Sequence, residues 1–178
     1  MIECYVDGSA HPNPGPGGFG VIVLDKDKKN EYNNYSLVEV YTKQFDKCTN
    51  NICELKSILY VFLNYGVNIN NREFAEIPIV YSDSTYAINT FENWMFSWAK
   101  NGWRKSDKKT PENLKIIQAY YDWYQKGYRI DLRKVKGHSD NYWNEVADKL
   151  ATGKMTPKEV EIMCEISKVF EKGDKLNG

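Results

Sequence analysis

The chain has 178 residues, of which 42% are hydrophobic and 27% are charged, and its 24 basic residues balance 24 acidic ones. This length and composition fit one soluble domain with a buried core, and the zero net charge excludes binding of a polyanion through overall positive charge. Apolar runs such as residues 21–24 are too short to span a membrane and no apolar leader is present, so we expect a cytoplasmic monomer without a membrane partner.

Three strands are predicted at the start of the chain, over residues 1–6, 19–24 and 31–41, with Asp7 at the end of the first strand. Short connections join these strands, which favours an antiparallel meander. A helix is predicted next, over residues 51–65, because its apolar residues recur at helical spacing.

The second half of the chain alternates strands and helices. Residues 77–83 read as a buried strand, and Ser84 is placed to cap a helix that runs through Phe91. Pro111 opens another helix, and residues 129–135 alternate as in a strand.

The last predicted elements are a helix that begins near Trp143 and an amphipathic helical extension over residues 154–178. We therefore divide the chain into a domain over residues 1–153 and this C-terminal extension. The order of elements predicts an α/β fold with a mixed five-stranded sheet, in which three antiparallel strands are followed by two parallel ones and helices flank the sheet.

Two common kinds of site are excluded by their sequence context. Gly15, Gly17 and Gly20 form a G-x-G-x-x-G, but they lead into the strand-like residues 19–24 and not into a helix, as a dinucleotide loop requires. A tight turn between antiparallel strands explains these glycines better. The four cysteines contain no Cys-x-x-Cys pair, and with only two histidines a zinc site is not expected.

Four carboxylates on separate elements point toward one edge of the predicted sheet. Asp7 and Asp83 end two strands, Glu54 lies on the core-facing side of its helix, and Asp148 follows Asn144 by one helical turn. Each residue alone is more often structural than catalytic. Together, with no run of Lys or Arg beside them, they indicate a site for a divalent cation with hard oxygen ligands, such as Mg²⁺ or Mn²⁺.

Five motifs in this order resemble type 1 ribonuclease H, and they cover nearly the whole chain to about Ala151. The motifs are DGSAHPNPGPGGFG (7–20), TNNICEL (49–55), YSDSTYAIN (81–89), WMFSWAKNGWRKSDKK (94–109) and VKGHSDNYWNEVADKLA (135–151). The resemblance implies a ribonuclease H-like fold with its catalytic domain in residues 1–153. It implies an endonuclease that hydrolyses the RNA strand of RNA–DNA hybrids and leaves 5′-phosphate and 3′-hydroxyl ends.

The resemblance also implies the roles of the site residues. Asp7, Glu54, Asp83 and Asp148 would bind two Mg²⁺ ions, for which Mn²⁺ could substitute, and His138 would move a proton on a loop beside them. No side-chain nucleophile is needed in such a reaction.

Substrate contacts follow from the same resemblance. Residues 100–115 carry six basic and two acidic side chains, and they match a basic protrusion that straddles the DNA strand. Three groups of residues match the hybrid-binding surface: a DNA channel of Tyr86, Trp94, Trp98 and Ser106, a DNA phosphate pocket of Lys47, Thr49 and Asn101, and an RNA sugar edge of Asn13, Asn50 and Asn51. Such contacts carry no base code, so we expect cleavage largely independent of sequence.

Two alternatives stay open at this stage. A 3′–5′ exonuclease of the same superfamily typically has Asp-x-Glu on its first strand, where this chain has Ser9. A non-catalytic hybrid-binding module would have no reason to keep four mutually repelling carboxylates. An assay on labelled hybrid with Mg²⁺ distinguishes both from the endonuclease.

Overall fold

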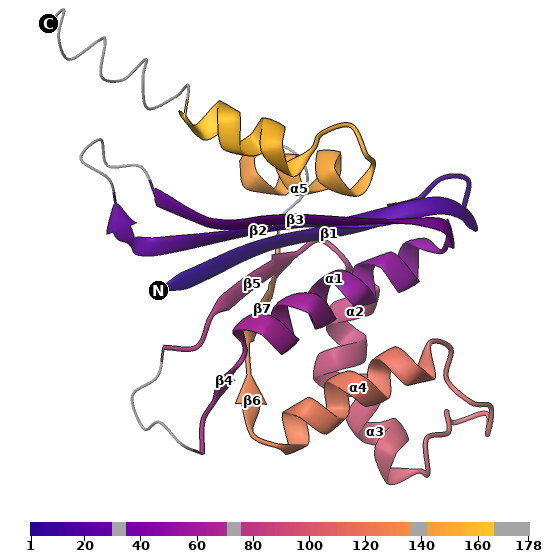
Figure 1. Ribbon diagram of the computed structural model, residues 1–178. Helices are drawn as coiled ribbons and strands as arrows, with labels where there is room; N and C mark the ends of the chain where they lie inside the picture. Colours follow the sequence, from indigo (N-terminus) through magenta and orange to yellow (C-terminus); the bar gives the residue numbers. More distant parts are fainter. Residues whose placement is uncertain (30–34, 71–75, 136–141, 166–178) are drawn as a thin grey trace, which may run out of the picture.

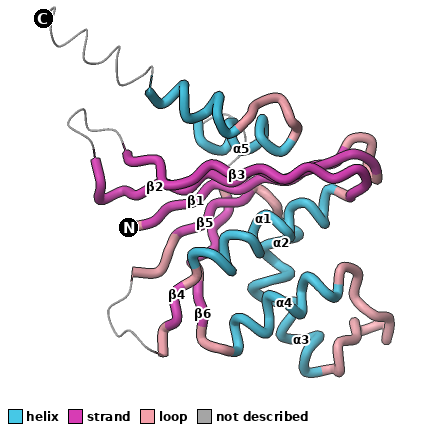
Figure 2. Tube along the Cα trace, viewed as in Figure 1, coloured by secondary structure: helices cyan, strands magenta, loops and turns pink. Residues whose placement is uncertain are grey.

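Five strands form one mixed sheet in the order β3-β2-β1-β5-β7 (Figure 1). The computed structural model describes residues 1–29, 35–70, 76–135 and 142–165. The strands are β1 (Ile2–Ala10), β2 (Gly15–Lys29), β3 (Tyr35–Cys48), β5 (Ile79–Ser82) and β7 (Asp131–Lys134). Two further short strands, β4 (Val67–Asn68) and β6 (Tyr128–Arg129), pair with each other outside this sheet (Figure 2).

Strand pairing confirms the predicted topology. β1, β2 and β3 form the antiparallel meander, and β5 then pairs with β1 in parallel, in the register Cys4↔Val80. β7 pairs in parallel with β5. The carboxyl ends of β1, β5 and β7 therefore lie at one edge of the sheet.

Helices cover both faces of the sheet (Figure 1). One face carries the helices of the middle of the chain, α1 (Asn50–Tyr65), α2 (Thr85–Asn89), the π-helical turn η1 (Thr90–Trp94), α3 (Met95–Lys100) and α4 (Leu114–Gln125). The other face carries α5 (Tyr142–Ala151) and the helical residues 157–165. None of the helices in the described ranges has the length and apolar character needed to cross a membrane.

The alternation of side chains along the strands builds a separate core on each face. Val21 and Val23 pack toward α1 in one buried cluster, whereas Ile22 and Leu24 pack toward α5 in another. Because both faces are covered, residues 21–24 are all apolar and all buried, as expected for a central strand.

The meander is longer than the sequence pattern predicted. β1 continues to Ala10 instead of ending at Asp7, because the pairing with β2 extends to Ala10↔Gly17. Gly15, Gly17 and Gly20 accordingly lie within β2, so the prediction of a turn at these glycines was wrong. β3 extends to Cys48, and residues 31–34 of its predicted range lie outside the described residues.

Two predicted elements of the second half also differ. The helix capped by Ser84 does not end near Phe91 but continues through η1 and α3 to Lys100. The strand predicted over residues 129–135 is divided, because Arg129 pairs with Val67 in the small sheet and β7 begins only at Asp131.

The C-terminal extension packs against the α5 face of the sheet. Val160 is completely buried in the cluster that also holds Ile22, Leu24 and Leu150. The described part of the extension is helical over residues 157–165, while residues 166–178 lie outside the described residues. The domain boundary at residue 153 stays a prediction.

Candidate active site

Asp7 lies in β1 opposite Gly20 of β2, and it is buried, with only 6% of its surface exposed. β5 ends at Ser82, so Asp83 follows the carboxyl end of the strand that runs parallel to β1. Burial raises the pKa of Asp7 well above its ordinary value, and the charges of Asp83 and Asp148 raise it further. Asp7 is therefore in electrostatic contact with two of the three other predicted carboxylates.

Asp148 reaches this edge from the opposite face of the sheet, on α5. Val146, Ala147 and Leu150 anchor α5 in the core, and the half-buried Asp148 lies near enough to Asp7 to raise the pKa of the Asp7 carboxyl. Two carboxylates this close repel each other when both are ionised, which adds to the effect of burial.

Glu54 approaches from α1, and its Oε2 accepts a hydrogen bond of 2.6 Å from Ser84 Oγ. The same Ser84 oxygen caps α2 by accepting from the Ala87 N–H at 3.0 Å. Burial raises the pKa of Glu54, the Ser84 bond partly offsets this rise, and the charge of Asp83 adds to it. One serine thus fixes both the start of a helix and the orientation of a predicted metal ligand.

Two glycines, Gly8 in β1 and Gly20 in β2, allow the helices to come this close to the sheet. A Cβ on Gly8 would meet the backbone carbonyl carbon of Cys53 and lie 2.5 Å from the Glu54 nitrogen on α1. A Cβ on Gly20 would lie 2.5 Å from both the Ala147 oxygen and Leu150 Cβ on α5. The sequence analysis assigned neither glycine this role, because a close approach between distant segments leaves no local pattern.

The donor set fits a divalent cation. Asp7, Glu54, Asp83 and Asp148 offer hard oxygen ligands from four different elements, and the raised pKa values of Asp7 and Glu54 reflect burial and repulsion that a cation would relieve. Within the described ranges, no three His, Cys, Asp or Glu side chains are close enough together to form a ready-made metal cage. His138 lies outside the described residues.

The predicted RNA sugar edge lies where the β1–β2 loop meets the start of α1. Asn13 Oδ1 accepts from the Asn50 N–H at 3.1 Å, and Asn50 Oδ1 accepts from the Ala10 N–H at 2.7 Å. Both amide oxygens are therefore used within the protein, and both amide nitrogens remain as donors for a ligand. Asn51 is half-buried beside them.

The predicted DNA phosphate pocket lies partly at the same helix start. Thr49 caps α1 by accepting from the Ile52 N–H at 3.1 Å, and Lys47 is exposed at the end of β3. Asn101 is exposed at the C-terminal end of α3, where its backbone N–H bonds to carbonyl groups of the last turn.

The predicted DNA channel contains a row of aromatic side chains. The Tyr86 and Trp94 ring centroids are 6.2 Å apart, and those of Trp94 and Trp98 are 6.1 Å apart. These three residues line a groove of about 240 Å³ together with Lys105 and Glu112, whose place in the groove the sequence analysis did not identify. Ser106 is exposed in the loop that follows Lys105.

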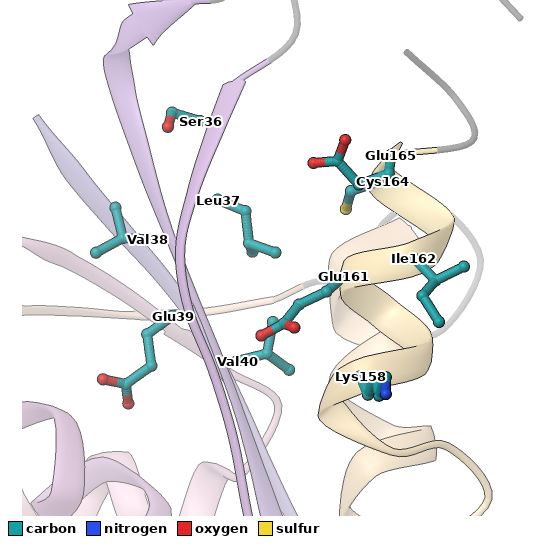
Figure 3. Close-up of a pocket in the computed structure, with 10 residues that line it drawn as sticks. All are labelled: Ser36, Leu37, Val38, Glu39, Val40, Lys158, Glu161, Ile162, Cys164 and Glu165. Atoms are coloured by element: carbon teal, nitrogen blue, oxygen red, sulfur yellow. The ribbon is translucent and has the colours of Figure 1, made fainter. Parts of the chain in front are cut away.

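A larger groove of about 650 Å³ lies away from these carboxylates, between β3 and residues 157–165 (Figure 3). Three glutamates and one lysine are its charged lining residues, namely Glu39, Glu161, Glu165 and Lys158. A surplus of negative charge makes this groove unsuited to a nucleic-acid phosphate.

Comparison with known proteins agrees with this arrangement. The family model for RNase H matches residues 1–156. Ribonuclease H of Thermoanaerobacter sp. (strain X514) is 36% identical over 153 residues, which cover 85% of this chain and 88% of that protein. Ribonuclease H of Acetivibrio thermocellus is 37% identical over 153 residues, covering 85% and 92% of the two chains.

Solved structures share the fold at lower identity. LC9-RNase H1, described as a type 1 RNase H with the type 2 active-site motif, superposes with a TM-score of 0.66 at 24% identity, covering 85% of this chain and 70% of that one. LC11-RNase H1 in complex with an RNA/DNA hybrid gives a TM-score of 0.56 at 18% identity, covering 86% and 95%. At these identities the structures support the fold alone.

Replacing Asp7 with Asn is expected to stabilise the metal-free protein by roughly 1–3 kcal/mol at neutral pH, because the parent must either bury the Asp7 charge beside like charges or take up a proton to avoid it, and Asn does neither. The measurement is urea unfolding in EDTA, with Asp122→Asn on the exposed side of α4 as the matched control. An Asn variant less stable than the parent in EDTA would show that Asp7 acts mainly as a hydrogen-bond acceptor.

The same pair of proteins gives a pH test. Asp7 has a pKa of about 9 in the folded protein and an ordinary pKa of 3.8. The native state therefore binds more protons than the unfolded state between these two pH values. The stability of the parent protein should therefore fall as pH rises through this window, and the advantage of Asp7→Asn should vanish once the pH is below about 3.8. An advantage that persists at acidic pH would contradict this origin.

Replacing Gly8 with Ala should destabilise the fold by about 1–3 kcal/mol, because the new methyl group meets α1 backbone that cannot move independently. Gly18→Ala in β2 is the control, since the three atoms nearest to its added Cβ belong to the Gln44 side chain, which can shift at the cost of its bonds to the Leu150 and Ala151 carbonyls, and not to backbone. Equal unfolding midpoints for the two variants in urea would refute the close-approach role of Gly8.

Proposed function

The chain belongs to the RNase H family of enzymes, and we propose that it is an endonuclease that hydrolyses the RNA strand of RNA–DNA hybrids and leaves 5′-phosphate and 3′-hydroxyl ends. The observation that carries the proposal is that Asp83 and Asp148 both act electrostatically on the buried Asp7, while Glu54 is hydrogen-bonded to Ser84, the residue after Asp83. The substrate assignment rests on the family and on the polar and aromatic surfaces beside these carboxylates.

Asp7, Glu54, Asp83 and Asp148 are the residues that would hold two Mg²⁺ ions, or Mn²⁺ in their place. The chemistry that such ions supply when bound is activation of the attacking water and stabilisation of the leaving oxygen. The raised pKa of Asp7 means that its carboxyl must lose a proton before it can act as a ligand, so activity should rise with pH as this proton dissociates. Ser84 keeps Glu54 oriented, which makes Ser84 a positioning residue.

The remaining residues are proposed to bind the hybrid. Asn13, Asn50 and Asn51 would contact RNA sugars, where a 2′-hydroxyl distinguishes RNA from DNA. The aromatic groove of Tyr86, Trp94 and Trp98, with Ser106, would hold the DNA strand, and Lys47, Thr49 and Asn101 would bind a DNA phosphate. His138 is proposed to carry a proton beside the carboxylates.

The direct test is cleavage of a hybrid labelled on either strand. We expect internal cuts in the RNA strand only, in the presence of Mg²⁺ or Mn²⁺, and none in excess EDTA. Asp7→Asn should abolish cleavage while the protein remains folded. Cuts in double-stranded DNA at equal rate, or full activity in EDTA, would overturn the proposal, and hybrid binding without cleavage would favour a non-catalytic binding module.

Trp98→Ala is expected to raise KM more than it lowers kcat, because a stacking contact with a strand contributes about 1–3 kcal/mol to binding. Trp98 also packs partly against the core, so thermal unfolding must accompany the kinetics. Trp123→Phe on α4 serves as the control, since it alters an aromatic residue that lies outside the groove. An unchanged KM in a fully folded Trp98→Ala protein would contradict the predicted contact.

A further inference from the structure

A further groove, of about 220 Å³, runs between β3 and α1 on the α1 side of the sheet. We call it the Lys43–Lys56 groove, after one lysine on each element. Its other lining side chains are aromatic or aliphatic, and no carboxylate is among the described residues that line it. The groove therefore combines positive charge with an apolar floor.

Phe45 holds the two ammonium groups at one place in the groove. Lys56 Nζ lies 4.4 Å from the centre of the Phe45 ring, and Lys43 Nζ lies 5.6 Å from it. The ring in turn packs on Phe19, at a centroid distance of 6.1 Å, and on the buried cluster beneath the start of α1. Two cations gathered over one ring, with no acid to pair them in the groove, form a suitable receptor for a phosphate.

The rest of the groove offers flat apolar surface. Tyr41 and Tyr60 stack with their ring centroids 4.3 Å apart and their planes at 4°. Leu63 lies further along α1 and is 46% exposed. Glu39 on β3 does not line the groove, and it accepts hydrogen bonds from the hydroxyls of Tyr60 at 2.5 Å and Tyr65 at 2.9 Å. These two hydrogen bonds hold the Tyr60 and Tyr65 side chains in place.

We propose that the Lys43–Lys56 groove binds single-stranded DNA that continues from the DNA strand of the hybrid. The groove begins two turns along α1 from Thr49, and Phe45 precedes Lys47 by two residues, so it adjoins the proposed DNA phosphate pocket. Positive charge interleaved with aromatic rings is how proteins hold single strands without reading sequence. This inference rests on the proposed function, because that function supplies the path of the DNA strand.

The test compares a blunt hybrid with the same hybrid carrying a single-stranded DNA tail at the end nearest the phosphate pocket. The parent protein should cleave the tailed hybrid with a lower KM. The double variant Lys43→Gln, Lys56→Gln should lose this advantage, with a KM for the tailed hybrid roughly five- to tenfold higher and an unchanged KM for the blunt one. The slope of log affinity against log salt should shrink by about 0.7 for each DNA phosphate that the variant no longer neutralises.

Two controls isolate the groove from general charge. Lys28→Gln with Lys126→Gln removes the same net charge at exposed sites elsewhere, including a lysine that lies 5.5 Å from the Trp123 ring, and should leave the tail advantage intact. Lys43→Arg with Lys56→Arg keeps both charges and should retain it too.

The outcomes separate the two proposals. A tail that gives no advantage to the parent, or an equal loss on blunt and tailed hybrids, would overturn the groove assignment and favour a protein partner for this surface. If the parent cleaves no hybrid, the proposed function fails. Fluorescence anisotropy of the labelled DNA tail alone still decides the groove, because binding that the double glutamine variant weakens and the control pair does not would support it.

Discussion

The close approach of two helices to two neighbouring strands, β1 and β2, is the constraint on which the rest of the structure depends. β1 lies in the middle of the sheet, and α1 and α5 press on the sheet from opposite faces at Gly8 and Gly20. A side chain at either glycine would overlap backbone atoms, and backbone inside a packed helix cannot shift alone. With glycine at both positions, Glu54 and Asp148 arrive beside the strand that carries Asp7.

This arrangement concentrates negative charge at the most buried end of the sheet. Burial and like charge both raise the pKa of Asp7, which means that the ionised site opposes folding. The two apolar clusters on either side of the sheet offset that cost, since they bury the whole of Ile22, Leu55, Ile58 and Phe62. Catalytic sites often carry such local destabilisation, because a cation or substrate later relieves it.

A chain without net charge must recognise a polyanion through local positive surfaces. In the described part of this chain, lysines line two grooves, and a glutamate-rich surface lies elsewhere. The aromatic groove of Tyr86, Trp94 and Trp98 is also lined by Lys105, which belongs to the basic residues 100–115. The Lys43–Lys56 groove adds two cations between β3 and α1. Glu161 and Glu165, on the helical residues 157–165, lie on the opposite face of the sheet from both grooves, so they do not oppose binding at close range.

Local pattern was enough for several elements. Ser84 caps a helix where the sequence predicts it, and the apolar spacing of residues 51–65 matches α1 closely. Motif order then identified the family and hence the sheet topology. The predicted strand boundaries were wrong where pairing with a distant strand determines them. β1 continues past Asp7 to Ala10 because it pairs with β2, and Arg129 belongs to a separate small sheet because it pairs with Val67.

The sequence by itself determined which elements form, the family and the candidate carboxylates, because these depend on residue type and on spacing along the chain. Only the tertiary structure decided how those carboxylates meet: that Ser84 holds Glu54, that Asp83 and Asp148 raise the pKa of Asp7, and that Gly8 and Gly20 make room for both helices. Lys43 and Lys56 likewise meet over Phe45 only after β3 packs beside α1. The reason is that contact distance, burial and electrostatic coupling belong to pairs of residues far apart in the chain, and no local pattern encodes them.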